Sequence, residues 1–202
     1  MSAKDLYDGL VQACGYVLAE QSFEQKGNAF YFSNAENKAI ISFQKSPKTT
    51  SSEILFTLEL GLFSGAIHDF MAADTTVDFP AIASCHWRKN IGAYLEVKND
   101  DPKWWSVRHT QTQILQKEIM TILINKAIPD LKQTMTDSRL GALWFGGAAP
   151  GLTEFQRLCY LSILLKNINR EKELMDVLAQ LEEQFSNTDQ DEMLQMHLSK
   201  IL

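Results

Sequence analysis

Residues 54–62 read Ile-Leu-Phe-Thr-Leu-Glu-Leu-Gly-Leu, and every even-numbered position in this segment is a large apolar residue. The odd-numbered positions are mixed, because a threonine, a glutamate and a glycine follow the first leucine. Side chains alternate between the two faces of a strand. This period of two therefore predicts a β-strand with one buried face and one partly solvated face.

Two earlier segments show the same alternation. The nearer one places Ile41 and Phe43 on one side, and the farther one supplies Phe30 and Phe32. Polar residues typical of turns separate the three segments. We therefore predict a three-stranded antiparallel meander over residues 22–63.

Most of the remaining chain before residue 146 shows helical spacing of its apolar residues, with two further β-prone segments. The predicted helices span residues 3–20, 66–72, 111–125, 129–136 and 138–145. One further strand with its following turn is predicted within residues 84–95, and another strand over 104–109.

A helix beginning at Asp101 and Pro102 is the alternative for the last predicted strand. We prefer the strand, because Thr110 and Gln113 form a second helix start, a capping box, a few residues later.

The glycine- and proline-rich segment 146–151 is the clearest boundary in the chain. Beyond it the pattern is helical throughout, with predicted helix starts at Thr153, Asn169 and Asp189. The prediction is an α+β domain over residues 1–145, with an antiparallel sheet of about five strands covered by helices. This domain is followed by a linker over 146–151 and by a C-terminal helical hairpin or three-helix appendage over 152–202.

Composition excludes several classes of protein. The net charge is −6 and no basic arm is present, which disfavours a nucleic-acid or membrane-surface binder. Cys14, Cys85 and Cys159 are odd in number and far apart, as in proteins of a reducing compartment. We expect no signal peptide, because Asp5 and Asp8 lie where a basic and then apolar run would be needed, and no membrane-spanning helix, because no apolar stretch is long enough. We therefore expect a soluble, cytoplasmic protein.

The meander also carries a recognisable pattern. Residues 23–31 read Phe-Glu-Gln-Lys-Gly-Asn-Ala-Phe-Tyr, residues 41–46 read Ile-Ser-Phe-Gln-Lys-Ser, and residues 56–61 read Phe-Thr-Leu-Glu-Leu-Gly. In this order they resemble a bacterial family catalogued as domain of unknown function 4304.

The segment Cys85–Arg88 and the Trp104–Trp105 pair resemble later landmarks of that family. The resemblance covers about residues 5–140 and departs from the family pattern at Lys89–Asn90, where a further basic residue is expected before Ile91. It implies the α+β fold and the strand placement, and it implies no activity.

Lys45 and Arg88 are the charged residues with the greatest potential to bind a ligand, because each is expected near a strand end beside Gln44 or His86. If they converged, with Trp104 at the flank, they would hold a carboxylate or phosphate through charge-assisted hydrogen bonds. The simpler interpretation is a sheet-edge lysine and an arginine stacked on a tryptophan. Both interpretations remain open.

The sequence predicts no catalytic residue, metal or cofactor. Cys85 and His86 are adjacent in a strand, so their side chains point to opposite faces and do not form a nucleophile–base pair. The four histidines lack metal-binding spacing. Gly146–Gly147 lacks the order of a phosphate-binding loop.

Acidic residues gather in the C-terminal helices. They are most simply a solvated helix face, and the functional alternative is a surface for a basic protein partner. We hypothesise a non-catalytic binding protein, such as an immunity or regulatory protein. The alternatives are a small-molecule or anion-binding domain or enzyme, and a homodimer through the terminal helices. The candidate partner-binding residues are Glu171, Glu173, Asp176, Glu182 and Glu183.

Overall fold

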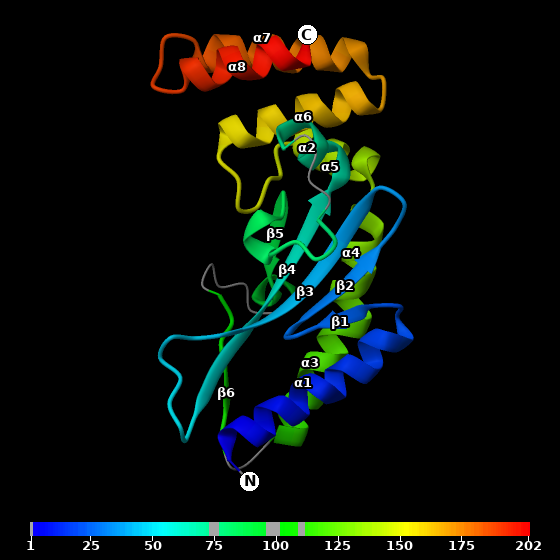
Figure 1. The fold of residues 1–202 in the computed structure, drawn as a ribbon, viewed down its shortest axis with the longest axis vertical. Helices are drawn as coiled ribbons and strands as arrows, with labels where there is room; N and C mark the ends of the chain where they lie inside the picture. The colour runs from blue at the N-terminus through cyan, green and yellow to red at the C-terminus, as the bar shows by residue number, and fades with distance from the viewer. Residues whose placement is uncertain (1, 73–76, 96–101, 109–111) are drawn as a thin grey trace.

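The computed structural model describes residues 2–72, 77–95, 102–108 and 112–202, which form an α+β fold (Figure 1). The strands are β1 (Glu24–Lys26), β2 (Ala29–Ser33), β3 (Asn37–Lys45), β4 (Ile54–Ser64), β5 (Trp87–Asn90) and β6 (Trp105–Val107). The α-helices are α1 (Ala3–Glu20), α2 (Gly65–Met71), α3 (Thr112–Ile122), α4 (Ile128–Thr134), α5 (Asp137–Phe145), α6 (Glu154–Asn167), α7 (Glu171–Phe185) and α8 (Asp191–Ile201).

The strands pair in the order β1-β2-β3-β4-β5, and all the pairs are antiparallel. β6 also pairs with β4, through residues 54–56, whereas β5 pairs with residues 59–62. Two short strands therefore share one edge of the longest strand. The three-stranded meander is confirmed, and β1 adds a short edge strand that the sequence analysis did not predict.

The predicted inward face of β4 is confirmed. Ile54, Phe56, Leu58, Leu60 and Leu62 are all buried in one apolar core with residues of β2 and β3. α1, α3 and α4 cover this face of the sheet (Figure 1). On the opposite face a second, smaller cluster contains Ile40, Phe63 and Cys85.

α3 and α4 form one continuous helical rod. A π-helical segment, Leu123–Ala127, joins them, and the residues at both of its ends keep right-handed helical dihedrals. Pro129 is the second residue of α4, which confirms the predicted helix start near this proline, but α4 is continuous with α3 and not separate from it. Proline lacks the N–H that would bond to the preceding turn, and the wider π turn just before it is a known way of accommodating such a defect.

The C-terminal helices pack onto the rest of the chain. α6 contacts α2 and α5, and α7 and α8 pack on α6 as the outermost elements (Figure 1). The main apolar core continues without a break from α1 to α8.

Two predicted helix starts are wrong. Asn169 does not cap α7, because it has a positive φ of 55° after α6, and Arg170 is the N-cap. Gln190, not Asp189, precedes α8. The capping box predicted at Thr110 and the helix start at Asp101 lie outside the described residues. The strand preferred over that helix is confirmed as β6.

Candidate functional site

The two charged residues of the predicted anion site lie on opposite faces of the sheet. Lys45 is in register with Phe56, on the face that α1 covers, and its ammonium nitrogen lies 4.3 Å from the ring centroid of Tyr7. Arg88 is in register with Gly61, five positions farther along β4 and on the other face. Five residues of a strand span roughly 17 Å, so the geometry does not support one small anion bound by both residues.

The structure also disperses the other polar members of the predicted site. Gln44 shares a face with Arg88, but it is in register with Thr57, near the other end of β4. Trp104 is 44% exposed and lies just before β6. The guanidinium of Arg88 donates to the carbonyl of Gly151 at 3.4 Å, so this arginine holds the glycine-rich segment against the sheet.

His86 is buried in surroundings that favour its neutral ring. Its Nδ1 accepts a hydrogen bond from the backbone N–H of Ser64 at 3.0 Å, and its ring contacts those of Phe63 and Tyr160. Burial lowers the pKa of His86 to about 4, and the nearby charge of His68 contributes. The imidazole therefore carries no positive charge for an anion at neutral pH.

Ser64, His86 and Asp137 lie close together but do not form a catalytic triad. The Ser64 hydroxyl donates to the carboxylate of Asp137 at 3.2 Å instead of to the imidazole. The imidazole accepts a hydrogen bond from the backbone N–H of Ser64 and not from its hydroxyl. All three residues are less than 10% exposed. Nucleophilic catalysis needs a base bonded to the attacking hydroxyl, so this cluster is structural.

The same aspartate ties the C-terminal helices to the sheet. Asp137 accepts hydrogen bonds from the Asn37 amide at 2.8 Å, from Ser64 and from the Asn167 amide at 2.9 Å. The Asn37 amide also donates to the carbonyl of Met135 at 2.7 Å. This junction joins β3, β4, α5 and α6. Sequence reasoning missed it, because Asn37 and Asp137 are 100 residues apart and carry no motif.

A second polar cluster fills the gap between β5 and β6. Asn90 donates to the hydroxyl of Thr57 at 2.8 Å and to the carboxylate of Glu59 at 2.7 Å. Its carbonyl oxygen accepts from the backbone N–H groups of Gly92 and Lys103, both at 2.9 Å. One side chain thus links β5, β4 and Lys103 beside the part of β4 that lies between the residues paired with β6 and those paired with β5.

The neighbouring Lys89 is also held by internal contacts. Its ammonium lies 2.9 Å from the carboxylate of Asp130 and within 5.2 Å of the ring centroids of Trp87 and Tyr94. Burial works to raise the pKa of Asp130, but hydrogen bonds from Tyr94 and Lys89 outweigh it and lower the pKa. The basic charge is already partnered within the fold.

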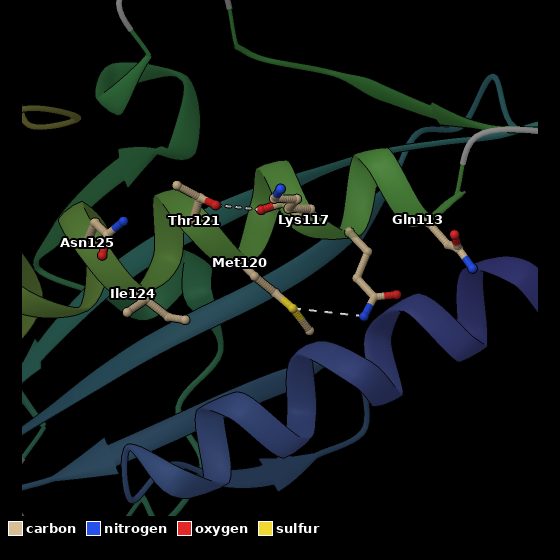
Figure 2. Close-up of a pocket in the computed structure, with 7 residues that line it drawn as sticks. Gln113, Lys117, Met120, Thr121, Ile124 and Asn125 are labelled. Atoms are coloured by element: carbon tan, nitrogen blue, oxygen red, sulfur yellow. Dashed lines mark hydrogen bonds between the residues drawn. The ribbon is translucent and has the colours of Figure 1, made fainter.

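A shallow hollow of about 500 Å³ lies beside α3 and the π-helical segment (Figure 2). Its lining comes from one side of a single helical rod, where Gln116 bonds to the sulfur of Met120 and Thr121 bonds to a backbone carbonyl. Among the described residues that line it, Lys117 is the only ionisable one. The described lining residues all belong to this one rod, so no second element faces them across the hollow.

The predicted partner-binding residues lie on α7, in the outermost layer. Glu171, Asp176, Glu182 and Glu183 are exposed, whereas Glu173 is partly buried and paired with Arg170. Hydrogen bonds from Arg170 lower the pKa of Glu173. Between residues 170 and 200 the chain has eight acidic and three basic side chains.

Within the described ranges, no group of three or more histidine, cysteine, aspartate or glutamate side chains is placed to hold a metal ion. No helix among these residues is long and apolar enough to cross a membrane.

Comparison with known families identifies residues 15–133 with the family described as "Domain of unknown function (DUF4304)". The matched segment is more than half of the chain, so the protein belongs to this family. The resemblance inferred from the meander is therefore confirmed. Searches of curated proteins and of solved structures gave no match.

Proposed function

We propose that this member of the DUF4304 family is a non-catalytic binding protein whose helices α7 and α8 cover a basic protein partner. The observation that carries the proposal is the excess of eight acidic over three basic side chains between residues 170 and 200, in the outermost layer of the fold. A surface of one sign attracts partners of the opposite sign and speeds their association.

The way in which this layer is attached supports the proposal. α7 and α8 pack on α6, and α6 is held to the sheet by Asn167, by the buried Asp137 and by the continuous apolar core. The acidic surface is therefore presented on a preorganised support, which lowers the entropic cost of binding. An immunity or regulatory protein that masks a basic partner is the concrete form of this function.

Affinity capture from the native host tests the proposal. The native chain is expected to recover a basic protein, and the variant E171Q/D176N/E182Q/E183Q is expected to lose it. A matched control, D8N/E20Q/E24Q/E36Q, removes the same charge from exposed positions outside the C-terminal helices and is expected to retain the partner.

With the purified partner, the association rate is expected to fall steeply as salt is raised. The proposal is overturned if no basic protein is captured, or if the α7 variant captures it as well as the control does. Light scattering addresses the homodimer alternative, and we expect a monomer mass near 22.9 kDa, since two acidic surfaces repel each other.

A further inference from the structure

In α7 and α8 the buried apolar residues differ in type from the large exposed ones. The inward residues are branched, and the large outward residues are methionines that expose about half of their surface or more. Met175 is 57% exposed, Met193 is 52% exposed and Met196 is 59% exposed. The buried set consists of Leu174, Val177, Leu178, Leu181, Leu194, Leu198 and Ile201.

Methionine is suited to a surface that must contact another molecule. Its unbranched side chain and polarizable sulfur adapt to partners of varied shape. Met193 and Met196 are three residues apart in α8, so they lie on neighbouring positions of one helix side. The core of α7 and α8 does not use them, because both remain exposed after packing on α6.

The charge of the helices that carry these methionines selects the occupant. The same two helices carry the acidic excess, so a second copy of the chain would be repelled, and a basic partner would be attracted. A helix that is basic on one side and apolar on the other matches both the charges and the methionines.

We infer, building on the proposed function, that the surface of α8 around Met193 and Met196 docks an amphipathic basic helix of the partner. Met193 and Met196 contact its apolar side, and exposed carboxylates of the same helix, such as Glu192 four positions before Met196, contact its lysine or arginine side chains.

A synthetic peptide of leucine and lysine, with its leucines on one helical side, serves as the probe in fluorescence anisotropy. The reference peptide has the same composition with its leucines scattered. The native protein is expected to bind the amphipathic peptide about tenfold more tightly than the scattered one, since only the first presents a continuous apolar side.

The variant M193Q/M196Q keeps the length and helix propensity of these side chains while removing their apolar surface. It is expected to weaken binding of the amphipathic peptide about tenfold. The matched control is I114Q, which removes a 70% exposed apolar residue from α3, and it is expected to bind like the native protein.

Equal affinity of the native protein for the two peptides, or unchanged binding by M193Q/M196Q, overturns the inference. If M193Q/M196Q also captures the host partner normally while the α7 charge variant does not, the inference fails and the proposed function stands. If the charge variant retains the host partner, the proposed function fails as well.

Discussion

The two faces of the central sheet are stabilised in different ways. The face toward α1, α3 and α4 is a continuous apolar core, in which the Phe56 ring contacts three other aromatic rings. Among the described residues, the opposite face has only a small buried apolar cluster, and Asn90 and His86 make specific hydrogen bonds beside it. The stability contributed by β4 therefore depends on the volume of packed side chains on one face and on the geometry of hydrogen bonds on the other.

Removing volume from the core face should have the largest effect. Phe56→Ala deletes a fully buried ring that packs against Tyr7, Phe43 and Trp105. The expected loss is about 3–5 kcal/mol of unfolding free energy, measured by urea denaturation. A loss below about 1 kcal/mol would show that this face is not the principal core.

Adding volume to the opposite face should have the next largest effect. A Cβ at Gly61 would lie 2.5 Å from the sulfur of Cys85 and 2.6 Å from Cδ1 of Ile82. We expect Gly61→Ala to cost about 1–3 kcal/mol in the same urea assay.

Gly9 offers a matched control, because it lies in α1 with nothing within 4 Å of an added Cβ. Gly9→Ala is expected to stabilise the protein by up to about 1 kcal/mol. If both glycine variants were stabilising, the tight packing described around Gly61 would be wrong.

Acid should weaken the second face through His86. The pKa of this histidine is lowered to about 4 when folded, against an ordinary value near 6.5. The unfolded chain therefore binds a proton at a higher pH than the folded chain does. Stability is fully present above about pH 6.5 and is lost as the pH falls toward 4, by an amount on the order of 1–3 kcal/mol.

Urea denaturation between pH 7 and pH 4 measures this loss. His197 has a similarly lowered pKa, again because of burial, and it bonds to Ser162 in α6. His86→Asn should remove one part of the loss of unfolding free energy at low pH, and His197→Asn should remove another part. Full pH dependence in both variants would contradict the assignment to these two residues.

Removing the Asn90 side chain should have the smallest effect of the four. Asn90→Ala leaves the N–H groups of Gly92 and Lys103 without their acceptor, at an expected cost of about 1–2 kcal/mol. Hydrogen exchange should show increased opening of β5, with little change in β2. Uniform opening of the whole sheet would argue against a local role.

The sequence predicted the parts of the fold that depend on local pattern. The alternation in residues 54–62 identified the inward face of β4, since a period of two needs no knowledge of partners. β1 has three residues, too few for a pattern. The π-helical segment keeps helical spacing closely enough to look like an ordinary helix.

The candidate site was less predictable, because it depends on register and on distant partners. Nothing local to Lys45 or Arg88 specifies that their strand partners on β4 are five positions apart. The role of Asp137 arises from residues on three other elements. The position of the acidic helix was predictable, since charge and helical spacing are both local.

The junction at Asp137 has a consequence for limited proteolysis. The segment 146–151 is mostly exposed and rich in glycine, so it is a natural site for a protease to cut. The two fragments would still share the apolar core and the Asn167–Asp137 hydrogen bond. A nicked protein should therefore run as two bands in denaturing electrophoresis and elute as one intact particle from a native sizing column.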